Sequence, residues 1–118
     1  MNRAVRAYSE ALAHDARDYQ IYLERARALV EQGYFDRAIR DLDEAVKFKP
    51  KDPLVHYNRA RTYSLSHRAS ESMKGLREAI SRDAEFREAA RADEDFANLR
   101  SDPKHGSEFE RLVAEPED

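Results

Sequence analysis

Apolar residues recur at helical spacing along most of the chain. Tyr22, Ala26 and Leu29 follow one another at i, i+4 and i+7, which places them on one face of a helix. A break at Gln32-Gly33 follows, and the same period then resumes at Phe35, Ala38, Ile39, Leu42, Ala45 and Val46. The pattern predicts two amphipathic helices joined by a short turn.

Turn and capping residues stand where these helices should end and begin. Gly33 suits a helix C-terminus, because glycine readily adopts the left-handed conformation that lets the chain turn. Asp52 can cap the next helix, and Pro53 fits its first turn. Three lysines near the end of the preceding helix offset its negative pole and need not form a basic patch: Lys47, Lys49 and Lys51.

The pattern of residues 19–52 repeats in residues 53–86 without a gap. The tripeptide Arg-Ala-Arg marks the register, since it begins at Arg25 and again 34 residues later at Arg59. The remaining identities are Leu42/Leu76, Glu44/Glu78 and Ala45/Ala79. Self-similarity at a fixed period of this length indicates an array of helix pairs.

Residues on both sides extend the array. Residues 3–16 match the second helix of a unit, with apolar positions at Ala4, Tyr8, Ala11 and Leu12. Residues 86–100 match a first helix that the run Ala92–Asp95 interrupts, and Ser101-Asp102-Pro103 restarts a helix through about Ala114. We expect one domain over 1–118, divided into a partial unit at 3–16, repeats at 19–52 and 53–86, a degenerate repeat with capping helices at 87–114, and a frayed acidic tail at 115–118.

Composition supports a water-exposed helical protein. Charged residues make up 38% of the 118 positions and hydrophobic residues 41%, with only three Gly and four Pro. No cysteine is present, which excludes a disulfide framework, a Cys-based zinc site and a thiol nucleophile. The apolar runs are too short for a membrane span, and the N-terminus lacks a signal-peptide core. These features predict a cytoplasmic protein that binds no membrane.

Neither charge nor motifs point to nucleic acid or to catalysis. The net charge is −3, whereas nucleic-acid-binding domains are usually basic. No phosphate-binding loop or nucleophile elbow occurs, and the four histidines form no metal-binding spacing: His14, His56, His67 and His105. His56 instead suits an aromatic slot between helices. We therefore expect no enzymatic activity, no cofactor and no metal.

Both units share one spacing of small and large residues. The first contains Tyr22-x2-Arg25-Ala26-x2-Leu29, then Ala38-x3-Leu42, Ala45 and Pro50. The second contains His56-x2-Arg59-Ala60-x2-Tyr63, then Ser72-x3-Leu76, Ala79 and Ala84. This spacing resembles the 34-residue tetratricopeptide repeat. The resemblance implies an all-α fold, an α-solenoid forming a right-handed superhelix of antiparallel helix pairs, with about 2.5–3 units and roughly six to seven helices.

The second unit departs from the repeat pattern at three positions. His67 replaces the glycine between the helices, and Ala84 replaces the closing proline. Gly75 weakens its helix by about 1 kcal/mol relative to alanine, so this unit should be the softer one. The segment DEDFANLRSDPKHGSEFERL is similar to the degenerate end of many bacterial arrays of this family.

The resemblance also implies a concave groove, lined mainly by the first helix of each pair, that binds an extended peptide or a helix. The candidate peptide-binding residues are Leu23, Arg27, Tyr57, Asn58, Arg61 and Arg91. Because arginine pairs well with carboxylates, we expect an acidic segment to dock there. Alternatively, these arginines pair with Glu24, Glu31 or solvent.

One sub-family of these repeats grips a C-terminal carboxylate of heat-shock chaperones through Lys, Asn, Asn, Lys and Arg. Only Asn58 matches that set, since Leu23 and Arg27 stand at its first two positions and Ala92 at the last. Glu88 reverses a required charge. We therefore do not assign the chain to this sub-family.

The two arginines of each Arg-Ala-Arg tripeptide should have different roles. Arg25 and Arg59 lie beside the small packing residues, so their stems should lie between helices. Asp41 or Asp43 can neutralise Arg25, whereas Gly75 and Arg77 occupy those places in the second unit, so Arg59 needs another partner.

The sequence therefore favours a non-enzymatic scaffold that binds another protein. The alternative is weak self-association through an end of the solenoid. A third class, an enzyme or RNA-binding protein on a helical scaffold, has the balanced charge and the missing motifs against it.

Overall fold

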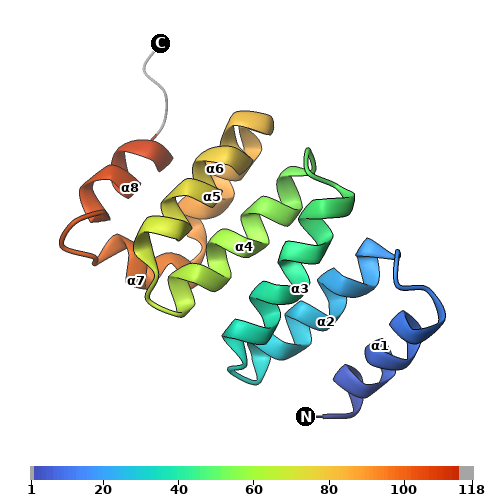
Figure 1. Cartoon of the computed structure of the whole chain (residues 1–118). Coiled ribbons are helices and arrows are strands. Elements are labelled where there is room, and N and C mark those ends of the chain that lie inside the picture. Colours follow the sequence, from blue (N-terminus) through green and yellow to red (C-terminus); the bar gives the residue numbers. More distant parts are fainter. Residues whose placement is uncertain (1, 115–118) are drawn as a thin grey trace. The chain divides into compact units, whose positions relative to one another are not determined.

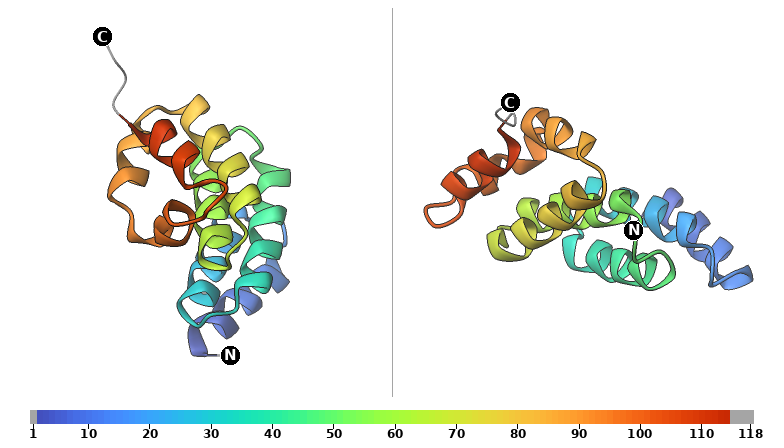
Figure 2. Two further views of the ribbon diagram at one scale, coloured as in Figure 1. Left: turned by 90° about the vertical axis from the view of Figure 1, so that its left-hand side faces the viewer. Right: turned by 90° about the horizontal axis from the view of Figure 1, so that it is seen from above.

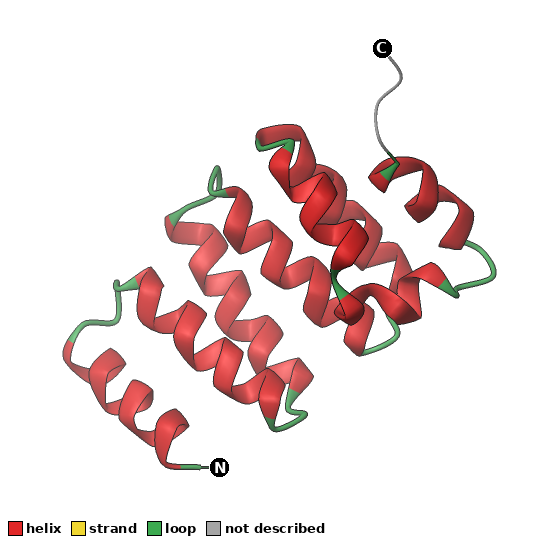
Figure 3. Ribbon diagram, turned by 180° about the vertical axis from the view of Figure 1, so that it is seen from behind, coloured by secondary structure: helices red, strands yellow, loops and turns green. Residues whose placement is uncertain are grey.

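The computed structural model describes residues 2–114, which contain eight α-helices, one short 3-10 helix and no strand (Figure 3). The elements are α1 (Arg3–His14), α2 (Tyr19–Glu31), α3 (Phe35–Phe48), α4 (Pro53–Leu65), α5 (Ala69–Arg82), α6 (Glu85–Ala92), η1 (Glu94–Phe96), α7 (Ala97–Arg100) and α8 (Gly106–Val113). None of these helices is long and apolar enough to cross a bilayer. The predicted acidic tail lies outside the described residues.

The helices belong to two compact units, Met1–Lys51 and Asp52–Asp118. In the first, α2 and α3 form an antiparallel pair, and α1 packs against α2 (Figure 1). In the second, α4 and α5 form the equivalent pair, followed by the α6–α8 segment (Figure 1). The all-α class and the helix pairs are confirmed, while the single domain stays a prediction.

Small residues allow α2 and α3 to pack closely in the first unit. Ala26 and Ala38 are both buried, and Leu29 and Leu42 fill the space beside them. The Asp18 side chain caps α2 by accepting a hydrogen bond from the backbone nitrogen of Gln20 at 3.1 Å. The apolar period of the sequence therefore identified the packed faces of this helix pair correctly.

The second pair uses the same register with different residues. Ala60 on α4 faces Ser72 on α5, and the Ser72 hydroxyl donates to the Ala60 carbonyl oxygen at 2.8 Å. A Cβ added to Gly75 would lie 3.3 Å from both the Ala60 Cβ and the His56 carbonyl oxygen. Gly75 thus has a packing role besides the helix-weakening effect expected of it. Met73, two residues earlier on α5, belongs to the hydrophobic core of the second unit and is 1% exposed.

The α6–α8 segment begins as predicted and then departs from the prediction. The run at 92–95 does interrupt the helix, since α6 ends at Ala92 and η1 follows. The helix expected after Ser101-Asp102-Pro103 is present and ends close to the predicted position, but its predicted start is wrong, because α8 begins only at Gly106. The Asp102 side chain instead accepts hydrogen bonds from the backbone nitrogens of Lys104 and His105 and holds a turn. These extra breaks are why the described chain has more helices than the predicted six to seven.

An aromatic cluster joins the α6–α8 segment to α4 inside the second unit. Phe96 and Phe109 are fully buried, with ring centroids 5.7 Å apart, and the Tyr57 ring lies 5.6 Å from Phe96. Arg87 and Arg91 on α6 donate to the carbonyl oxygens of Leu112 and Val113 at the end of α8. These contacts hold α8 against α6 and α7 (Figure 2).

The turns inside the two helix pairs both contain a residue with left-handed backbone. Gly33 has a φ of 83°, as its position predicted, and His67 has a φ of 61°. Because a residue with a Cβ is strained there, we expect His67→Gly to raise the free energy of unfolding by about 1 kcal/mol. Gly33→Ala should lower it by a similar amount, although a Cβ there meets nothing within 4 Å. Urea unfolding measures both, and a loss of stability in His67→Gly would contradict the expectation.

Candidate protein-binding site

One face of α4 brings three of the predicted binding residues together. Tyr57 and Arg61 are one helical turn apart, and the Arg61 Cζ atom lies 5.8 Å from the centroid of the Tyr57 ring. Asn58 lies beside them, and its side-chain oxygen accepts a hydrogen bond from Arg61 Nη1 at 3.5 Å. Tyr57 is buried, whereas Asn58 and Arg61 are partly exposed. This face of α4 therefore combines the buried aromatic ring of Tyr57 with the partly exposed guanidinium of Arg61.

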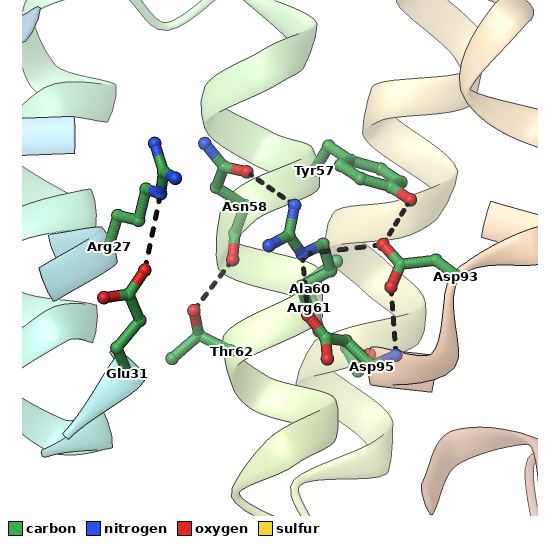
Figure 4. A network of polar contacts seen from close by, with 10 residues as sticks. Arg27, Glu31, Tyr57, Asn58, Ala60, Arg61, Thr62, Asp93 and Asp95 are labelled. Carbon is green, nitrogen blue, oxygen red and sulfur yellow. Dashed lines mark hydrogen bonds and ion pairs between the residues drawn. The ribbon is translucent and has the colours of Figure 1, made fainter. Parts of the chain in front are cut away.

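The acidic turn between α6 and η1 lies opposite this face (Figure 4). Arg61 Nε is 3.5 Å from Asp93 Oδ2 and 3.3 Å from Asp95 Oδ2. Asp93 also accepts a hydrogen bond from the Tyr57 hydroxyl at 2.8 Å and caps η1 by accepting one from the Asp95 backbone nitrogen at 2.9 Å. We call this group of Tyr57, Asn58, Arg61, Asp93 and Asp95 the Arg61 site.

The Tyr57 hydroxyl remains a hydrogen-bond donor in this site. Burial, and then the hydrogen bond to Asp93, raise the pKa of Tyr57 above its usual value. A neutral phenol can donate to the carboxylate, while a phenolate would be repelled by it. The hydrogen bond to Asp93 is therefore fixed throughout the physiological pH range.

Arg25 provides a comparison, because it pairs with a carboxylate in a different way. Its Nε and Nη2 atoms donate to the two oxygens of Asp41 at 2.8 and 2.6 Å, and the Asp41 side chain is 7% exposed. This confirms the predicted neutralisation, with Asp41 as the partner. Arg61 is held less closely, since its buried Nε has no hydrogen-bond partner among the described residues. The Arg25 pair is closed and structural, whereas the Arg61 pair is longer and more open.

Comparison with known proteins identifies the repeat. A family model described as "TPR repeat" matches residues 26–65. The solved complex of the TPR2B domain of yeast Sti1 with pHsp70 has a similar fold, with a TM-score of 0.69 and 25% identity over 81% of this chain and 79% of that one. Residues 26–65 thus match the tetratricopeptide repeat, and the chain has a fold similar to that of a domain of this family. No curated protein matches it in sequence.

The helix pairs α2/α3 and α4/α5 correspond to the two predicted repeats, and the other predicted binding residues lie on other helices, Leu23 and Arg27 on α2 and Arg91 on α6. Arg27 on α2 is 74% exposed, with its Nε 3.7 Å from Glu31 Oε1 (Figure 4). Such a surface pair contributes little stability, so Arg27 remains accessible. Leu23 is buried, and Arg91 donates to the Val113 carbonyl oxygen at 2.8 Å.

Arg59 occupies the position in the second unit that Arg25 occupies in the first, and it has a different partner, as the repeat register predicted. Its guanidinium lies over the Tyr63 ring, 5.7 Å from the centroid, on the same helix. The equivalent of the Arg25–Asp41 pair is missing inside the second unit, because Gly75 occupies the place of Asp41. The two helix pairs therefore keep the same arginine with different neighbours.

The six candidate binding residues predicted from the sequence include neither Asp93 nor Asp95. Asp93 follows the last residue of α6, caps the next turn and reaches a tyrosine 36 residues earlier. A local signal did exist, because an aspartate that ends one helix can cap the next turn. Its contact with Tyr57 depends on the direction of that turn, which capping does not specify.

Proposed function

We propose that this chain is a non-enzymatic interaction module that binds an acidic segment of another protein. Arg61 and Asn58 on α4 are the main contacts in the second unit, and Arg27 on α2 is a separate exposed positive charge of the first unit. The buried residues Leu23 and Tyr57 support the exposed binding residues of their own helices, α2 and α4. Arg91 holds the end of α8 in place. The observation that carries this proposal is the state of Arg61, whose guanidinium is partly exposed and whose buried Nε lacks a hydrogen bond.

Chemistry and fold family both support a protein ligand of this kind. A carboxylate can accept two parallel hydrogen bonds from a guanidinium, which gives both strength and orientation. The related TPR2B domain of yeast Sti1 was solved in complex with pHsp70, which supports a protein or peptide partner for this chain. The partner should differ from ligands of the carboxylate-gripping sub-family, because Glu88 is exposed where that sub-family needs a positive charge.

Fluorescence anisotropy with a labelled octaglutamate peptide at low salt tests the proposal. Arg61→Gln should weaken binding by about tenfold, since it removes a charge-assisted pair, and Arg27→Gln by about threefold. Arg40→Gln is the matched control, because Arg40 is an exposed arginine on α3 and is not among the proposed contacts. Equal affinities for the wild type and the Arg61→Gln protein would contradict the proposal. An octaglutamine peptide should not bind.

Self-association remains the alternative, and one observation favours it. Ala38 and Ser72, the small residues where the second helix of each repeat meets the first, are fully buried. Ala4 holds the equivalent position on α1 but is exposed, and no helix within residues 2–114 covers it. A helix from a second copy could pack there. Light scattering over a concentration series tests this alternative, because a molar mass that stays at the monomer value at every concentration excludes self-association.

A further inference from the structure

The Arg61 site already contains two carboxylates, and both come from the chain itself. We propose that the Asp93–Asp95 turn is an internal substitute for the acidic ligand, and that a partner must displace it from Arg61. This inference rests on the proposed function and adds a regulatory step to it. The turn would keep the site closed to weak or non-specific acidic segments.

The geometry of the turn suits a built-in competitor. Asp93 is held from two sides, by the Tyr57 hydroxyl at 2.8 Å and by its capping contact with the Asp95 backbone nitrogen at 2.9 Å. These contacts present both carboxylates to the same Arg61 Nε, at 3.5 and 3.3 Å. A tethered group competes at an effective concentration far above that of a free ligand.

The contacts with Arg61 are also weak enough to be exchanged. Charge-assisted hydrogen bonds between nitrogen and oxygen are usually about 2.7–2.9 Å long, and the Arg25–Asp41 pair is close to this range. Both oxygens at Arg61 Nε lie beyond it, and the Asp93 and Asp95 side chains are 20% and 37% exposed. An external carboxylate that reaches Arg61 in bidentate geometry would form better hydrogen bonds than the turn does.

The balance of charges in the site disfavours an acidic segment while the turn occupies Arg61. Two carboxylates face one guanidinium, so the closed site has a net negative charge and repels an acidic segment. Neutralising the turn removes both the competitor and the repulsion. The Asp93→Asn/Asp95→Asn variant does this with little change of shape, because an asparagine at position 93 can cap η1 through its oxygen while its amide nitrogen donates to the Tyr57 hydroxyl oxygen.

Two measurements on the full chain test the inference, with Glu94→Gln as the matched control. Glu94 lies in the same turn and carries the same charge, but it is exposed and its side chain makes no ion pair with Arg61 in the described structure. The first measurement is the rate at which phenylglyoxal modifies Arg61, followed by mass spectrometry of the Arg61 peptide. The rate should rise several-fold in the double asparagine variant and stay unchanged in Glu94→Gln.

The second measurement is octaglutamate affinity, which should rise about tenfold in the double asparagine variant and fall again when Arg61→Gln is added. An unchanged Arg61 modification rate would overturn this inference alone. A raised Arg61 modification rate with unchanged octaglutamate affinity would show that the turn does not compete with an acidic ligand. If the Arg61 modification rate rose but neither the wild type nor any variant bound octaglutamate, the proposed function would be overturned. The inference that the turn occupies Arg61 would still hold.

Discussion

Replacing Arg25 with alanine is expected to lower the free energy of unfolding by about 3 kcal/mol, because it leaves the buried Asp41 carboxylate without its partner. Asp41 accepts two short hydrogen bonds from Arg25, and the Ser9 hydroxyl accepts a third at 3.2 Å, so one guanidinium joins α1, α2 and α3. Removal of the side chain therefore affects all three helices of the first unit. Urea unfolding followed by circular dichroism measures the change.

Two variants separate the loss of this ion pair from a general loss of arginine. Arg27→Ala should change the free energy of unfolding by less than about 0.5 kcal/mol, since its pair with Glu31 is exposed. Arg25→Ala combined with Asp41→Ala should recover part of the loss, because no unpaired charge stays buried. Equal stabilities of the Arg25→Ala and wild-type proteins would show that the pair is not structural.

Phe96→Ala is expected to lower the free energy of unfolding of the second unit by about 4 kcal/mol, since the Phe96 side chain is fully buried at the centre of the aromatic cluster. The substitution removes contacts with both Tyr57 and Phe109, which join η1 to α4 and to α8. Tyr57 would lose its packing support and, with it, the fixed direction of its hydroxyl.

Amide hydrogen exchange tests both the size and the place of this effect. Protection should fall in the described part of the second unit, residues 52–114, and remain in α2 and α3 of the first unit. Leu54→Ala is the control, because Leu54 lies in the same unit but is 44% exposed, and it should cost less than about 1 kcal/mol. A loss below about 1 kcal/mol in Phe96→Ala would mean that the aromatic cluster is not the core of this unit.

The helix pairs could be predicted because their determinants are local and periodic. Small residues such as Ala26 and Ala60 recur at the helix crossing, and turn residues such as Gly33 stand between the helices. Each of these positions follows from a spacing or a backbone preference that is visible in a short window of sequence. The fold class and the repeat register therefore follow from the chain without its tertiary contacts.

The candidate site could be predicted only in part. The register placed Tyr57, Asn58 and Arg61 on one face of α4 correctly, because it is a property of a single helix. It could not show that Arg91 turns toward the end of α8, or that Asp93 reaches Tyr57. Both contacts depend on the path of the chain after Ala92, where the helical period stops and capping and turn geometry decide the direction.

Met73 links the packing of the second helix pair to oxidation chemistry. Its side chain is 1% exposed in the core that it shares with Ala60 of α4, so an oxidant in solution cannot reach the sulfur while this core is closed. Conversion to the sulfoxide would place a polar, larger group in that space and keep the helices apart. The rate at which Met73 gains an oxygen atom would therefore report how often this core opens spontaneously, and without a reductase each oxidation would be permanent.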